Sequence, residues 1–188
     1  MGNPLITRQE YKSYANLTNP NSDAEIDNLI PKVSELVKTY CNRSFVDWID
    51  EVKIEHFNGD SQYLILKECP VIEVLEVAYS SDYGVTYTPI LEHRDWVLDE
   101  DLIISTARDG FRKALRGYRV SYTAGYSSIP DDLKLAIMDL LTYYRRNDMA
   151  AHTSKGTSSG SMQIEYITAT GFPSHIRRVL DFYRGSYA

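Results

Sequence analysis

Histidines and cysteines are the side chains in this sequence that could ligate a metal ion or act as nucleophiles. The histidines are His56, His93, His152 and His175, and the cysteines are Cys41 and Cys69. Their spacings match neither a zinc site nor a C-x-x-C motif. The sequence therefore predicts no metal site and no bound cofactor. Two widely separated cysteines are simplest to explain as reduced thiols of a protein with a cytosolic history.

Paired carboxylates are the other groups that could carry chemistry, and both clusters have structural explanations. Asp131 and Asp132 follow Pro130, where carboxylates stabilise the positive end of a helix dipole. The acidic residues 99–101 fit the tight turn of a hairpin. No nucleophile elbow, phosphate-binding loop or dinucleotide-binding motif is present. We therefore predict a protein without catalytic residues, one that is not an enzyme.

One alternative gives the β-rich part of the chain a ligand to bind. His56, His93, Asp95 and Trp96 are the residues that could line such a site. In this alternative the chain is a small ligand-binding or accessory module. It would remain a monomer at all concentrations and would have a deep pocket in its β lobe.

Composition restricts the partners of the chain. Its 188 residues carry a net charge of −6, and the largest basic cluster lies at residues 108–119. Tight DNA binding needs a concentrated basic face, so strong or sequence-specific DNA binding is not expected. No apolar run is long enough to span a membrane. Fifteen tyrosines against five phenylalanines fit a surface that meets other proteins, or a half-exposed β layer that simply uses tyrosine.

Two helices are expected at the start of the chain. Thr7 and Glu10 form a predicted capping box, with Ile6 and Tyr11 as its hydrophobic staple, and the helix should end near residue 16.

A second capping box is predicted at Ser22 and Glu25. The helix it opens has an apolar face made of Ile26, Leu29, Ile30, Val33, Val37, Tyr40 and Cys41. Pro31 should either kink this helix near residues 28–31 or begin a new one, because proline removes a helical hydrogen bond.

Short strands replace the helical pattern after residue 44. The expected strands cover residues 52–57, 63–66, 71–79, 96–98, 102–104 and 118–123. Each is rich in β-branched or aromatic residues and is bounded by turn residues. Six short strands between two helical blocks indicate one antiparallel lobe inserted into a helical core.

A long helix follows Pro130, and its apolar positions lie on one face about three turns long. They are Leu133, Ala136, Ile137, Leu140, Leu141 and Tyr144. Arg145 and Arg146 are expected at the negative end of the helix dipole, and Asn147 as the C-cap.

The last part of the chain, residues 151–188, is predicted to form a flexible C-terminal arm. A polar Gly/Ser/Thr tract at residues 152–161 precedes a strand at 162–170 and a helix that begins at Pro173. The strand has no obvious hairpin partner nearby, which favours pairing with another chain, although a return to the edge of its own sheet remains the alternative. The predicted fold is thus α+β: a small helical bundle core (residues 1–50 and 124–150), an inserted antiparallel β lobe (51–123) and a flexible C-terminal arm of a strand plus a short helix (151–188).

Several short motifs, taken in order, resemble the head–tail connector proteins of long-tailed bacteriophages, which are also called adaptor or head completion proteins. They are LIT at residues 5–7, VKTYCNR at 37–43, PVI at 70–72, VSYTAGYSSIPDDLKLA at 120–136 and YYRR at 143–146. These motifs cover most of residues 5–147, and the chain after residue 150 matches much less.

The resemblance implies a structural virion protein of the phage neck. Copies would form a ring, commonly twelve-fold in this family, between the portal protein of the head and the tail completion or stopper protein below it. Duplex DNA would pass through the lumen without specific binding, as the acidic net charge also suggests. The subunits would reach the virion from the host cytoplasm.

The candidate contact surfaces of such a subunit come mainly from the arm. A strand without a local partner gains hydrogen bonds by joining the sheet of another chain, and the basic run is the other candidate surface between subunits. The candidate portal or inter-subunit interface comprises Ile164, Tyr166, Thr168, Ile176, Val179, Leu180, Tyr183, Arg112 and Arg116.

Overall fold

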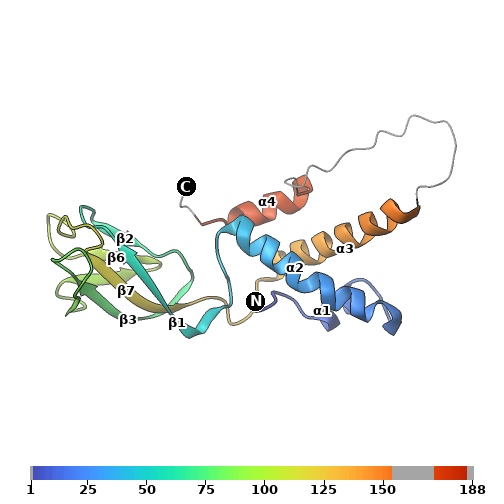
Figure 1. Ribbon diagram of the computed structural model, residues 1–188, viewed down its shortest axis with the longest axis horizontal. Coiled ribbons are helices and arrows are strands. Elements are labelled where there is room, and N and C mark those ends of the chain that lie inside the picture. Colours follow the sequence, from blue (N-terminus) through green and yellow to red (C-terminus); the bar gives the residue numbers. More distant parts are fainter. Residues whose placement is uncertain (1, 154–171, 186–188) are drawn as a thin grey trace. The chain divides into compact units, whose positions relative to one another are not determined.

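A computed structural model describes residues 2–153 and 172–185 of the chain (Figure 1). The chain divides into a helical unit, Met1–Cys41 with Pro130–Arg184, and a β unit, Asn42–Ile129. The predicted α+β class is confirmed, with four α-helices and two antiparallel sheets among the described residues. The predicted strand at residues 162–170 and the polar tract from residue 154 onward lie outside the described residues. The sequence-based domain boundaries after residues 50, 123 and 150 stay a prediction.

Helix α1 (Arg8–Tyr14) begins at the predicted capping box. The Glu10 amide donates to the Thr7 hydroxyl at 3.2 Å, and the Thr7 amide donates to the Glu10 carboxylate at 2.7 Å. Ile6 and Tyr11, the two expected staple residues, are both buried. Local sequence signals therefore suffice to place this helix start.

Helix α2 (Asp23–Cys41) follows a short 3₁₀ turn, η1 (Pro20–Ser22), and the predicted second capping box is wrong. Ser22 and Glu25 instead bind Arg145 of α3, at 2.7 Å and 3.1 Å. The helix runs unbroken through Pro31, so a new helix does not begin there. Most of its predicted apolar face is buried, namely Ile26, Ile30, Val33, Val37 and Cys41.

Helix α3 (Asp131–Thr153) is the core of the helical unit. Leu133, Ala136, Ile137, Leu140 and Leu141 are all buried, as their spacing predicts. The predicted C-cap at Asn147 is wrong because the helix continues to Thr153.

The amphipathic helix α4 (Ser174–Phe182) packs against α2 and α3 and buries Ile176 and Leu180 (Figure 1). The Tyr183 hydroxyl just beyond it donates to Asp132 at 2.6 Å. The predicted helix after Pro173 therefore exists, and its apolar face belongs to the chain's own core.

The β unit contains the six predicted strands and one that was missed. The strands are β1 (Trp48–Phe57), β2 (Tyr63–Ile65), β3 (Val71–Tyr79), β4 (Thr88–Ile90), β5 (Trp96–Asp99), β6 (Leu102–Ser105) and β7 (Tyr118–Ala124). One sheet has the order β1-β7-β3-β4 and the other β2-β6-β5, with all pairs antiparallel. The missed strand, β4, is three residues long, contains Pro89 and lies at a sheet edge, where proline costs no ladder hydrogen bond.

Strand β7 is the centre of the β unit. Tyr118, Val120, Tyr122 and Ala124 point into the core, where they join residues of the second sheet such as Leu64 and Ile103. The alternate residues of β7 face the other side of the four-stranded sheet. The two-residue period read from the sequence is therefore the period of burial.

The chain enters and leaves the β unit at one place. The Tyr126 amide, just after β7, donates to the carbonyl of Phe45, just before β1, at 2.8 Å. Gly125 has a φ of 130°, and a Cβ there would lie 2.6 Å from the same carbonyl oxygen. Only glycine fits this close approach without strain.

Candidate functional site

Among the residues that the structure describes, the histidines and cysteines do not come together in a reactive centre. Among the described residues, no three His, Cys, Asp or Glu side chains are grouped so that they could hold a metal ion. Burial raises the pKa of the Cys69 thiol to about 12, so this thiol stays protonated at neutral pH. The predicted hairpin turn at residues 99–101 joins β5 to β6, and its Asp101 accepts a hydrogen bond from the Val71 amide at 3.0 Å. That carboxylate therefore has a structural role.

The residues of the alternative ligand site are placed in two different parts of the β unit. Asp95 accepts from the Leu91 amide at 2.8 Å and from Arg94, and the buried Trp96 donates its indole N–H to the Ile90 carbonyl at 3.3 Å. His93 lies in the same turn, with a φ of 59°. His56 is on β1, at the opposite edge of its sheet from β4, and its ring centroid lies 5.7 Å from that of Tyr87.

A pocket of about 450 Å³ lies beside this turn, and of the four residues only Asp95 lines it. Its aromatic wall consists of Tyr79, Tyr118 and Phe111, with ring centroids 5.2 Å and 4.8 Å apart. Burial raises the pKa of Tyr118, so the hydroxyl is not an activated base or nucleophile. The pocket offers an apolar wall with arginines near it and no catalytic pair.

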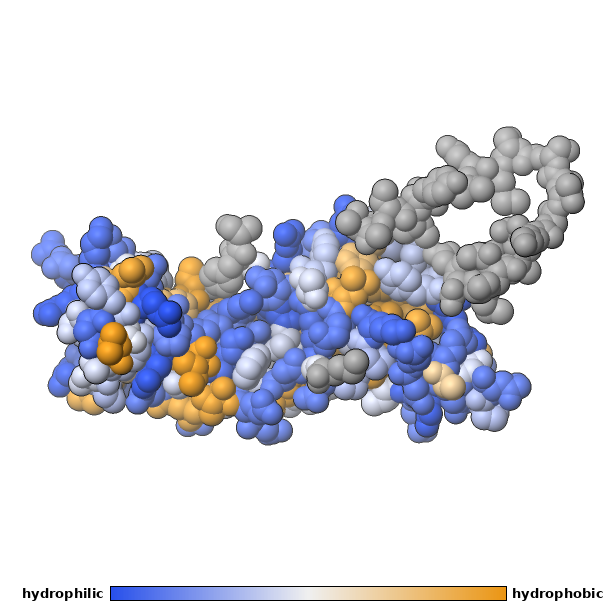
Figure 2. Space-filling view, viewed as in Figure 1, coloured by the Kyte–Doolittle hydropathy of each residue, from blue (hydrophilic) through white to orange (hydrophobic). Residues whose placement is uncertain are grey.

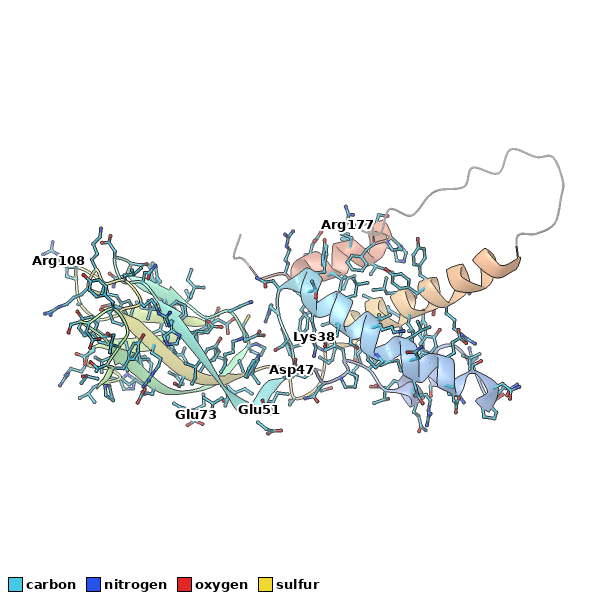
Figure 3. The ribbon with its side chains drawn as sticks, viewed as in Figure 1. Lys38, Asp47, Glu51, Glu73, Arg108 and Arg177 are labelled. Atoms are coloured by element: carbon cyan, nitrogen blue, oxygen red, sulfur yellow. The ribbon has the colours of Figure 1, made fainter. Side chains whose placement is uncertain are left out.

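The basic run at residues 108–119 covers most of the connection from β6 to β7 and the first two residues of β7, and it does not make one basic surface. Lys113 lies 2.9 Å from Asp60, and this hydrogen bond raises the pKa of the lysine. Arg119 binds Glu76 at 2.6 Å and stacks 4.7 Å above the Tyr87 ring. Arg108 points into solvent (Figure 3), and Arg112 and Arg116 are also exposed. Carboxylates thus offset two of the five cations.

The loop between β3 and β4, which we call the tip loop, is held by hydrogen bonds to one carboxylate and exposes two large side chains. The Asp82 carboxylate accepts from the Ser80 hydroxyl at 2.6 Å, the Val85 amide at 3.1 Å and the Thr86 amide at 2.9 Å. These hydrogen bonds, the one from Ser80 foremost, hold the pKa of Asp82 well below its ordinary value. Tyr83 and Val85 are 75% and 80% exposed. Large side chains on a preorganised loop are suited to contact a partner.

The four-stranded sheet also has an apolar surface that faces away from the core. Figure 2 shows several hydrophobic patches on the visible side of the β unit. On β1, Val52 and Ile54 alternate with the partly buried Lys53 and Glu55. On β3, the pairing register shifts between Val71 and Glu73 and again between Val74 and Glu76, so that Ile72 and Leu75 are additional residues in bulges.

Strand β7 lies between these two apolar strands and has small side chains on the same side. Ser121 is in register with Ile54 of β1 and Glu76 of β3, and Thr123 is in register with Glu73. We call this surface the outer face; it comprises Val52, Ile54, Ile72, Leu75, Ser121 and Thr123.

The predicted interface residues have unequal outcomes. Ile164, Tyr166 and Thr168 lie outside the described residues. Ile176 and Leu180 are buried within the helical unit, while Val179 and Tyr183 are half-buried, so this side of α4 meets its own chain. Sequence reasoning missed the outer face. Its signal in the sequence was that Val52 and Ile54 lie on one side of the predicted strand and Phe57 on the other, so both sides carry apolar residues.

Comparisons with known proteins agree on one family. Residues 4–186 match the family model described as head completion protein. The head completion protein of Escherichia phage T5 is 21% identical over 181 residues, which are 96% of this chain and 98% of that protein.

Two similar solved structures are chains from particle necks. One is the neck of an empty gene transfer agent (GTA) particle computed with C6 symmetry: 15% identity, TM-score 0.61, covering 98% of this chain and 91% of that one. The other is the neck of a native GTA particle computed with C12 symmetry: 16% identity, TM-score 0.57, covering 100% and 97%. These likenesses show a shared fold.

A search of the described helices for a candidate membrane-spanning segment finds none, because none combines the necessary length with sufficient hydrophobicity.

Proposed function

The chain belongs to the head completion protein family, and on that premise we propose that it is a structural, non-enzymatic protein of the virion neck. Copies of it form a ring that joins the portal of the head to the tail or to a stopper protein. The observation that carries this proposal is the family match, which extends over residues 4–186 and thus includes both units. The C6 and C12 symmetries of the similar neck structures support a cyclic assembly.

A cyclic ring places its own requirement on the subunit surface. Each copy must present two different patches that fit each other, because a head-to-tail contact repeats around the ring. The tip loop, the outer face and the exposed side of α4 are candidate patches. The arm strand at residues 162–170, with Ile164, Tyr166 and Thr168, is a further proposed contact, in which it joins a sheet edge of the portal or of a neighbouring copy.

The charge of the chain supports DNA passage without DNA retention. The net charge is −6, and two of the five cations of the basic run are paired with carboxylates. Few phosphate contacts mean weak, salt-sensitive binding. In a gel-shift assay at about 100 mM salt, the isolated protein should therefore not retain duplex DNA. Micromolar affinity would instead make Arg112 and Arg116 part of a DNA-binding surface.

Electron microscopy of the protein mixed with its portal tests the ring. We expect an additional ring of density on one end of the portal, absent when the protein is left out. Heads made without the chain should contain portals and fail to join tails. Tailed, infectious particles formed in its absence, or a chain that never attaches to portals, would refute the proposed function.

A further inference from the structure

The outer face leaves unusual apolar area in contact with water. Val52, Ile54, Ile72 and Leu75 are 47%, 54%, 52% and 50% exposed, and all four belong to the same four-stranded sheet. Scattered apolar residues are normal on a protein surface, whereas several on one sheet face mark a contact site. The small Ser121 and Thr123 of β7 lie between larger side chains of β1 and β3, and we call this strip of the outer face the trough.

Two carboxylates beside the trough, Glu51 and Glu73, have no counter-ion among the described residues. Glu73 is exposed and in register with Thr123, and Glu51 precedes Val52 on β1. Both carboxylates project outward from the β unit in Figure 3, and within the described residues neither has an ion-pair partner. Glu76 differs because Arg119 neutralises it at 2.6 Å. A surface that covers the trough should thus combine an apolar side chain with cations.

The exposed side of α4 combines these two features. Phe182 is 78% exposed, although Ile176 and Leu180 on the opposite side are buried. Arg178 lies one turn before Phe182, where the side chains of residues i and i+4 are neighbours. Neither Arg177 nor Arg178 forms an ion pair within the part of the chain that the structure describes, and Arg177 projects into solvent (Figure 3). Arg177, Arg178 and Phe182 line one shallow depression of about 500 Å³.

We propose that the outer face of each copy receives α4 of the next copy, with Phe182 in the trough and Arg178 against Glu73. This inference rests on the proposed ring, and it names the two surfaces that join its subunits. The two patches belong to different elements, as a repeating head-to-tail contact requires. The α4 patch carries two arginines and one aspartate, Asp181, so its net charge is opposite to that of the carboxylates on the outer face. When α4 covers the trough, the apolar side chains of the outer face and Phe182 both leave water, which favours the contact. The carboxylates beside the trough discriminate against a purely apolar or acidic partner.

Disulfide trapping in assembled particles tests the contact. The chain with both Leu75→Cys and Phe182→Cys replaces the original chain during particle assembly, and purified necks are oxidised and separated without reductant. We expect a ladder of covalent multimers, because each copy links to the next. Particles with either single substitution, or with only Cys41 and Cys69, should give monomers; Cys41 is buried and the thiol of Cys69 stays protonated.

Images of the same necks separate the two levels of the proposal. A ring without a ladder refutes the α4 contact and leaves the ring intact. A neck without repeated copies of the chain refutes the ring itself. A disulfide to a portal or tail chain shows that a different protein covers the outer face, and this result also overturns the inference.

A charge exchange covers the case in which the cysteine pair blocks assembly. Glu73→Arg and Arg178→Glu should each reduce the yield of complete particles by about tenfold, and the two together in one chain should restore it, since the pair then re-forms with reversed charge. Both positions are exposed, so folding is unaffected. Normal yields from both single variants, or no restoration by the double variant, contradict the contact.

Discussion

The core of the helical unit allows a matched pair of substitutions in α3. Leu140 is fully buried, whereas Leu135 on the same helix is 48% exposed. Leu140→Ala removes buried methyl groups and leaves a cavity, which costs about 2–5 kcal/mol of unfolding free energy. Leu135→Ala removes little buried area and slightly favours the helix, so its effect should stay within about 0.5 kcal/mol.

Urea unfolding followed by far-ultraviolet circular dichroism measures this difference, because the helical signal comes mainly from the helical unit. With a denaturant slope of about 1–3 kcal/mol/M, a loss of about 3 kcal/mol lowers the midpoint by roughly 1–3 M. Trp48 and Trp96 both lie in the β unit, so their fluorescence follows that unit separately. Equal midpoints for Leu140→Ala and Leu135→Ala in the circular dichroism signal would show that the assigned core face is wrong.

Three further substitutions test other parts of the structure. Arg145→Ala removes the hydrogen bonds to Ser22 and Glu25 and should cost about 1–3 kcal/mol; an unchanged melting temperature would contradict the bridge between α2 and α3. Burial raises the pKa of Cys69 from 9.0 to about 12. Between these two pH values the unfolded chain loses the thiol proton and the folded chain keeps it, so the free energy of unfolding falls as pH rises from 9.0 toward 12. The Cys69→Ala variant should show a smaller loss of stability in that window, and an equal loss would refute burial of the thiol. Asp82→Asn should accelerate hydrogen exchange of the Val85 and Thr86 amides with little change in melting temperature, whereas unchanged exchange would show that the carboxylate does not hold the tip loop.

Local patterns in the sequence predict most of the elements. The Thr7 and Glu10 side chains bind each other's backbone within one turn, and such a motif needs no distant partner. The two-residue alternation of β7 predicts which of its side chains are buried, and the helical spacing of α3 does the same from Leu133 to Leu141. Each of these signals acts over fewer than about three turns or one strand.

The predictions that failed depended on residues far apart in the sequence. Ser22 and Glu25 have the spacing of a capping box, yet Arg145 binds both of them from the opposite helix, more than a hundred residues away. Asn147 has the chemistry of a C-cap but lies within a helix that continues to Thr153. The outer face depends on two bulges in β3, at Ile72 and Leu75. The spacing of residues 71–79 alone does not show that these two residues have no partner on β7.

The hydrogen bond between Tyr126 and Phe45 brings the two ends of the β unit together. The Tyr126 nitrogen lies 2.8 Å from the Phe45 oxygen, so the chain leaves the β unit close to where it enters. Any domain whose termini lie equally close could be exchanged for it without lengthening or shortening either junction. During evolution, the sheets could therefore be replaced or elaborated wholesale while the sequence of the helices is kept. The two junctions of the β unit, at residues 41–42 and 129–130, are therefore natural boundaries for recombination between distant lineages.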